Sequence, residues 1–92
     1  MFPEIDFKIR KFLSENTAKY KVVSSGEAFF GEFLFMFQKI TETEKEIDLC
    51  ISYSPKTKTY ILRSDGSSVI ESESLEEILN LVKEQKPRSL IL

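Results

Sequence analysis

The chain has 92 residues, enough for one domain spanning residues 1–92 with a single core. Its 41% hydrophobic content is ordinary for a globular protein, and its net charge of −2 argues against a nonspecific coat on duplex DNA. Its longest apolar runs fall well short of the roughly 20 residues of a membrane span, and its N-terminus does not resemble a secretory signal, so we expect no membrane contact.

The N-terminal segment fits two patterns. Ile5, Phe7 and Ile9 alternate with charged residues, as in a strand. A larger apolar set has helical spacing instead: Phe2, Ile5, Ile9, Phe12 and Leu13. Pro3 in the first turn, early acidic residues and late basic residues all favour the helix, which we predict over residues 3–14.

Alternating apolar residues and turn residues follow. The most strongly patterned segment is residues 28–40, where every second side chain from Phe29 to Phe37 is aromatic except Gly31. Turn residues stand at 24–27, 41–45, 54–57 and 64–67, and the Asp65-Gly66 pair in the last is typical of a type I′ hairpin. We predict five antiparallel strands, at residues 19–24, 28–40, 46–54, 57–64 and 67–71.

A second helix is predicted near the C-terminus. Ser74 and Glu77 have the spacing of a capping box, in which each side chain hydrogen-bonds the other's backbone N–H. The apolar residues that follow lie on one helical face: Leu75, Ile78, Leu79 and Val82. Pro87 ends the helix, because its ring disfavours a helical conformation at the residue before it.

The expected turn lengths fix a register between neighbouring strands. The predicted apolar pairs are Val22–Phe29, Phe37–Ile47, Phe35–Leu49, Phe33–Ile51, Ile51–Tyr60, Leu49–Leu62, Leu62–Val69 and Ile61–Ile70. Opposite charges meet as Lys19–Glu32 and Asp48–Arg63, and Gly31 lies between Tyr20 and Tyr53, whose rings cover it.

In this register, the strong apolar positions share one face of the sheet. They are Val22, Phe29, Phe33, Phe35, Phe37, Ile47, Leu49, Ile51, Tyr60, Leu62 and Val69. Such a face needs a cover, and the two amphipathic helices can provide it. We therefore predict a two-layer α+β domain, with a five-stranded antiparallel meander between two helices that both pack on one sheet face.

The other face of the sheet is mostly polar, except for one row of apolar side chains. The row consists of Leu34, Cys50, Ile61 and Ile70, with Met36 and Phe30 nearby. Either the protein's own C-terminal tail covers it, or it is a small tolerated patch, or it binds another protein or a second copy of this chain. The apolar tail residues Leu90, Ile91 and Leu92 are a second candidate for protein binding, by docking or by adding a strand.

Single-stranded nucleic-acid binding is the alternative function. Lys56 and Lys58 lie at the tip of a predicted hairpin close to two tyrosines, and Arg63 follows on the sheet. The register turns both tyrosines toward the helices, and the acidic balance of the chain makes this alternative weaker than protein binding.

Catalysis has the least support in the sequence. Histidine, the commonest general base, is absent, and the three glycines are too far apart for a phosphate-binding loop. We expect no enzyme, no cofactor and no metal site. The single cysteine, Cys50, is expected to be a structural thiol in a reducing, cytoplasmic setting, and a charge content dominated by Lys and Glu is compatible with a thermophilic source.

Overall fold

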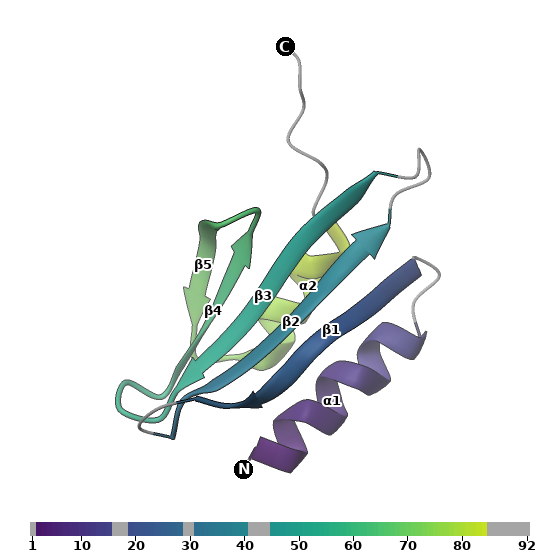
Figure 1. The fold of residues 1–92 in the computed structure, drawn as a ribbon. Coiled ribbons are helices and arrows are strands. Elements are labelled where there is room, and N and C mark those ends of the chain that lie inside the picture. The colour runs from purple at the N-terminus through teal and green to yellow at the C-terminus, as the bar shows by residue number, and fades with distance from the viewer. Residues whose placement is uncertain (1, 16–18, 29–30, 41–44, 85–92) are drawn as a thin grey trace.

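The computed structural model describes residues 2–15, 19–28, 31–40 and 45–84. It contains seven elements: α1 (Phe2–Glu15), β1 (Lys19–Glu27), β2 (Phe33–Ile40), β3 (Glu46–Ser54), β4 (Thr59–Ser64), β5 (Ser67–Ser72) and α2 (Leu75–Glu84). The strands form one antiparallel sheet in the order β1-β2-β3-β4-β5, a meander between two helices (Figure 1). The predicted α+β fold is confirmed.

Both helices contribute to the same hydrophobic core. The N-terminal segment is helical rather than extended, and α1 buries Ile5, Ile9 and Leu13. From α2 the core receives the predicted stripe, which is Leu75, Ile78, Leu79 and Val82. At the start of α2 the Ser74 hydroxyl accepts a hydrogen bond from the Glu77 backbone N–H (3.3 Å), as expected of the cap. The core also contains the aromatic side chains of β2, so the helices cover one sheet face.

The first hairpin differs from the prediction. Residues 24–27 are not a turn: β1 continues through them to Glu27, and a bulge between Val22 and Ser24 adds one residue to the strand. The chain reverses after Glu27, where Ala28 N donates to Glu32 O (2.6 Å) and Gly31 has a φ of +75°. Gly31 therefore serves a left-handed backbone position in the reversal, not the interior of a strand.

This correction changes the partners of β1. Val22 lies opposite Phe37, not Phe29, and Tyr20 lies opposite Lys39. The predicted Lys19–Glu32 pair does not form across the strands, because Lys19 lies opposite Ile40. Gly31 is not covered by two tyrosine rings either; a Cβ atom at this position would meet the Pro55 side chain at 3.5 Å.

The next two hairpins are shifted by two residues from the predicted register. Phe35 lies opposite Ile51 rather than Leu49, and Ile51 lies opposite Leu62 rather than Tyr60. The neighbouring pairs move with them, to Phe33–Tyr53, Phe37–Leu49, Lys39–Ile47, Tyr53–Tyr60 and Cys50–Arg63. The Asp48–Arg63 pair is therefore wrong. Because side chains alternate with period two, an even shift leaves every residue on its predicted face.

The last hairpin begins as predicted and then departs. Asp65 and Gly66 both have positive φ (49° and 84°), as a type I′ turn requires, and Ser64 lies opposite Ser67. A bulge between Leu62 and Arg63 then moves the pairing by one residue, so that Leu62 faces Ile70 instead of Val69. An odd shift exchanges the faces: Ile70 packs against the core and Val69 is 41% exposed.

Candidate functional site

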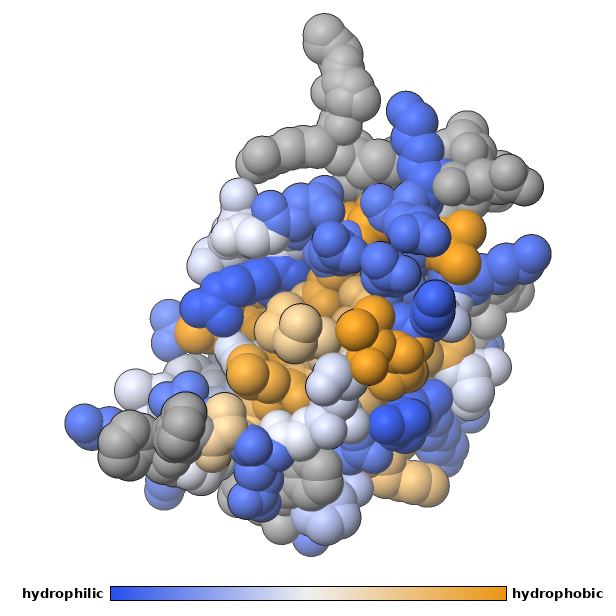
Figure 2. Space-filling model, viewed as in Figure 1, coloured by the Kyte–Doolittle hydropathy of each residue, from blue (hydrophilic) through white to orange (hydrophobic). Residues whose placement is uncertain are grey.

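The sheet face opposite the helices carries the candidate site, and we call it the outer face. Figure 1 looks onto this face, with α2 behind the sheet. In the same view, Figure 2 shows apolar side chains gathered at the middle of the face and hydrophilic ones around them. A patch of this kind at the centre of a polar surface is a common sign of a binding site.

Two successive rows of side chains cross the outer face. The strand register places Ser24, Met36, Cys50, Arg63 and Ser68 in one row. It places Gly26, Leu34, Ser52, Ile61 and Glu71 in the next. We call the four central apolar residues of these rows the outer patch: Leu34, Met36, Cys50 and Ile61.

Three of the four residues predicted for the apolar row lie in this patch. Leu34 and Ile61 flank Ser52 on either side, and Cys50 lies one step away along the same strand. The exception is Ile70, which the bulge in the last hairpin turns toward the core. Met36 joins the patch and is its most exposed member, at 43%.

A positive charge lies directly beside the apolar side chains. Arg63 is half-buried, lies opposite Cys50, and donates a long hydrogen bond from Nη1 to the Ser52 hydroxyl (3.4 Å). Ser52 itself is only 8% exposed although both described helices lie on the other side of the sheet; it lies between Leu34 and Ile61 on the neighbouring strands. In the described part of the chain the one ion pair is Arg10–Asp6, so Arg63 has no carboxylate within ion-pair distance there.

The Cys50 thiol is held in its neutral form. Burial raises the pKa of Cys50 above its usual value of 9.0, and the nearby Arg63 charge offsets only part of that shift. A thiol is nucleophilic as the thiolate, so this environment disfavours reactivity near neutral pH. The patch therefore has the chemistry of a contact surface, with a polarisable sulfur among aliphatic groups.

Polar pairs surround the outer patch. Gln38 Nε2 donates to Asp48 Oδ1 (2.9 Å) at one end of the strands, and Thr59 Oγ1 donates to Glu71 Oε2 (2.9 Å) near the other. The centre of the face is thus apolar and the rim is hydrogen-bonded and charged. This division is the usual anatomy of a protein–protein interface.

The structure does not bring the alternative cationic residues together. Lys56 and Lys58 are exposed in the turn between β3 and β4, whereas Arg63 is half-buried near the other end of β4. Tyr53 and Tyr60 face the helix layer, with ring centroids 4.6 Å apart, so they offer no stacking platform on the outer face. The tail residues Leu90, Ile91 and Leu92, like Phe29 and Phe30, lie outside the described residues.

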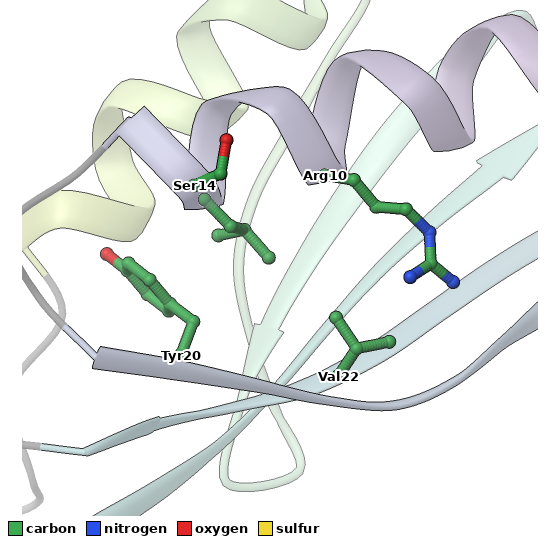
Figure 3. A pocket seen from close by; sticks show the side chains of 5 residues that line it. Arg10, Ser14, Tyr20 and Val22 are labelled. Atoms are coloured by element: carbon green, nitrogen blue, oxygen red, sulfur yellow. The ribbon is translucent and has the colours of Figure 1, made fainter.

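A hollow with a volume of about 260 Å³ lies between α1 and β1 (Figure 3). Arg10 points along it, held by Asp6 Oδ2 (2.9 Å) and the Ser25 hydroxyl (3.1 Å), with its guanidinium 5.5 Å from the centre of the Phe35 ring. The buried Tyr20 hydroxyl has no hydrogen-bond partner among the described residues. Sequence reasoning does not identify this hollow, because it depends on how α1 crosses the sheet.

Replacing Tyr20 with phenylalanine is expected to stabilise the domain by about 1 kcal/mol, since it removes a buried hydroxyl without a partner among the described residues. Burial also raises the pKa of Tyr20 above 10.0. Because the pKa is higher in the folded than in the unfolded state, wild type is destabilised when Tyr20 ionises. Its stability is therefore unaffected by this group below about pH 10 and falls as the pH rises toward and through the folded-state pKa. Urea unfolding at pH 7 and above pH 10 checks both effects: the variant should be more stable at neutral pH and lose less on alkalinisation. A less stable variant at pH 7 would show that the hydroxyl has a partner.

Two further findings concern the described residues as a group. No three His, Cys, Asp or Glu side chains among them converge in a way that could hold a metal ion. None of the helices in the described ranges combines the length and apolar character needed to cross a bilayer.

Comparison with known proteins gives no family assignment. No protein-family model matches the chain, and neither does any curated protein or any solved structure. A proposal for its function therefore depends on the chemistry of its own surfaces.

Sequence reasoning missed the place of Arg63 beside the patch. It assigned Arg63 to the polar face but paired it with Asp48, and the shift of two residues brings it beside Cys50 instead. The length of the turn after Ser54 would have corrected this, because Pro55 to Lys58 form a four-residue connection closed by a Lys58 N–Ser54 O hydrogen bond (2.7 Å).

Proposed function

We propose that this protein is a non-catalytic domain that binds a second copy of itself through the outer face of its sheet. The observation that carries the proposal is the outer patch: half-buried or exposed apolar side chains at the centre of the sheet face opposite the two described helices. The polar rim and Arg63 beside the patch support it, because interfaces are enriched in arginine and have polar edges.

The size of the face sets the expected strength of association. Five strands spaced about 4.8 Å apart and about 20 Å long give a contact area of a few hundred Å² per copy, near the lower end of specific interfaces. We therefore expect a dimer that dissociates on dilution. The test must cover a wide concentration range, from about micromolar to about millimolar.

The experiment is the solution mass of the wild type and of Ile61→Lys, by sedimentation or light scattering. Wild type is expected to shift from monomer to dimer with concentration, and Ile61→Lys to remain monomeric because a charge cannot be desolvated at the centre of an apolar contact. Circular dichroism and thermal unfolding show whether the variant keeps the fold. If Ile61→Lys unfolds the monomer, residue 61 is part of the core and the proposal fails.

Phe7→Lys is the matched control. Phe7 is a large apolar side chain on α1, 65% exposed, and it lies in the helix layer rather than on the outer face. The same change in charge and polarity at this position should leave the dimer intact. A dimer that survives Ile61→Lys but not Phe7→Lys would place the interface on the helices and overturn the proposal, as would a wild type that is monomeric at every concentration.

A further inference from the structure

A positive charge, that of Arg63, lies beside the outer patch, and no carboxylate among the described residues is within ion-pair distance of it. Arg63 is half-buried beside apolar side chains, and it donates a hydrogen bond to a neutral group, the Ser52 hydroxyl, at 3.4 Å. If a second copy covers the patch, as the proposed function requires, this guanidinium loses much of its water. A desolvated guanidinium needs a carboxylate, and that carboxylate must come from the partner subunit.

The outer face presents a carboxylate close to the patch. Glu71 lies opposite Ile61 on the edge strand β5, in the row next to that of Arg63. Within one molecule it accepts a hydrogen bond from Thr59, on the side away from Arg63. Arg63 and Glu71 thus lie on either side of the line that separates the two rows.

We infer that two copies pack outer face to outer face about a two-fold axis that runs across the strands, between the two rows. This axis exchanges the rows, so that Met36 lies over Leu34 of the partner subunit and Arg63 over Ile61 of the partner subunit. Glu71 of the partner subunit then lies one strand spacing, about 4.8 Å, to the side of Arg63 across the roughly 10 Å between facing sheets, a gap that the two long side chains can span. By symmetry the contact occurs twice, which gives two Arg63–Glu71 pairs in each dimer.

The other symmetric arrangement is less favourable. A two-fold axis along β3 would superimpose β2 on β4, which places Arg63 over Met36 of the partner subunit and leaves its charge unpaired. It would also place Asp48 against Asp48 of the partner subunit, and like charges across an interface oppose association. The axis across the strands avoids both problems and covers the patch equally well.

The test is charge reversal followed by mixing. Arg63→Glu alone converts both pairs to two carboxylates, and Glu71→Arg alone converts both to two guanidinium groups. Each variant should have a dissociation constant raised roughly 100-fold or more. When the two variants are mixed, every pair in the heterodimer again joins opposite charges, and a dimer close to wild-type strength should form. A role of either residue within its own molecule cannot be restored by mixing.

Neutral variants guard against effects on folding. Arg63→Gln and Glu71→Gln should each weaken the dimer to a smaller degree. Mixing them should restore it only in part, because the heterodimer keeps one Arg63–Glu71 pair and joins two glutamines at the other site. Charge-reversed variants that remain dimeric, or whose mixture stays monomeric while both fold, would overturn the inferred axis. The proposed function would survive that result provided that Ile61→Lys still abolishes the wild-type dimer; a wild type without any dimer would instead refute the proposed function.

Discussion

Phe35→Ala is expected to lower the free energy of unfolding by about 3–5 kcal/mol, the range for deleting a buried aromatic ring. Phe35 is completely buried, lies opposite Ile51, and packs edge-on against Phe37 with ring centroids 5.6 Å apart. The guanidinium of Arg10 also lies over its ring. Truncation leaves a cavity where the two layers meet and removes aromatic and cation–π contacts together.

Phe7→Ala is the matched control for this loss. It deletes the same ring from an exposed position on α1, where alanine has the higher helix propensity, so the change should stay within about 0.5 kcal/mol. Both variants are best measured by urea unfolding in the Ile61→Lys background, because the proposed dimerisation would add a concentration-dependent term to the stability. Equal losses in the two would mean that burial at Phe35 contributes little, contrary to its packing.

A loss of this size is large for a domain of 92 residues. At roughly 0.05–0.15 kcal/mol per residue, its total stability should be about 5–14 kcal/mol. Phe35→Ala therefore removes at least about a fifth of the stability, and nearly all of it if the domain is at the lower end of this range. The core rests on the aromatic segment of β2, whose alternation is also the clearest pattern in the sequence.

The faces of the central strands could be predicted from the sequence even where their partners could not. Phe35 was expected opposite Leu49 and lies opposite Ile51, yet it is buried in either case. Turn lengths decide the partner, and the composition of a turn does not fix its length within two residues. Alternation decides the face, and an even error in register does not change it.

The bulges could not be predicted, and they account for the errors in the outer face. Val69 and Ile70 are both β-branched and apolar, so the pattern alone does not tell which one faces the core. The bulge between Leu62 and Arg63 decides it for Ile70. Similarly, the serines and glycine of residues 24–27 have turn chemistry, but the bulge after Val22 keeps them within β1.

Lys39→Met is the second variant with a large expected effect, a loss of about 1–3 kcal/mol. Lys39 is only 8% exposed, on the core side of β2. Its Nζ donates hydrogen bonds to Val82 O (3.2 Å) and Lys83 O (2.7 Å) in the last turn of α2. A positive charge at this end of a helix satisfies carbonyls that have no partner within the helix and complements the helix dipole.

Methionine keeps the length and apolar stem of lysine but has no N–H donor, so the variant separates packing from hydrogen bonding. The wild type bears a free-energy cost for desolvating the Lys39 charge, and the methionine variant does not. The expected loss of stability is therefore smaller than the contribution of the two charge-assisted hydrogen bonds themselves. Lys19→Met is the control, since Lys19 is exposed at the start of β1 and should tolerate the change within about 0.5 kcal/mol.

Hydrogen exchange of the amides tests the location of the effect as well as its size. In Lys39→Met the last turn of α2 should exchange faster, while the amides of β2 and β3 should change only by the global loss of stability. Uniform acceleration across helix and sheet would show that Lys39 supports the core as a whole rather than the end of α2. The sequence alone could not separate these roles, because the carbonyls that Lys39 binds lie more than forty residues further along the chain. Lys39 reaches these carbonyls because α2 packs on the sheet with its last turn beside the end of β2. There the buried charge of Lys39 has hydrogen-bond acceptors among the described residues.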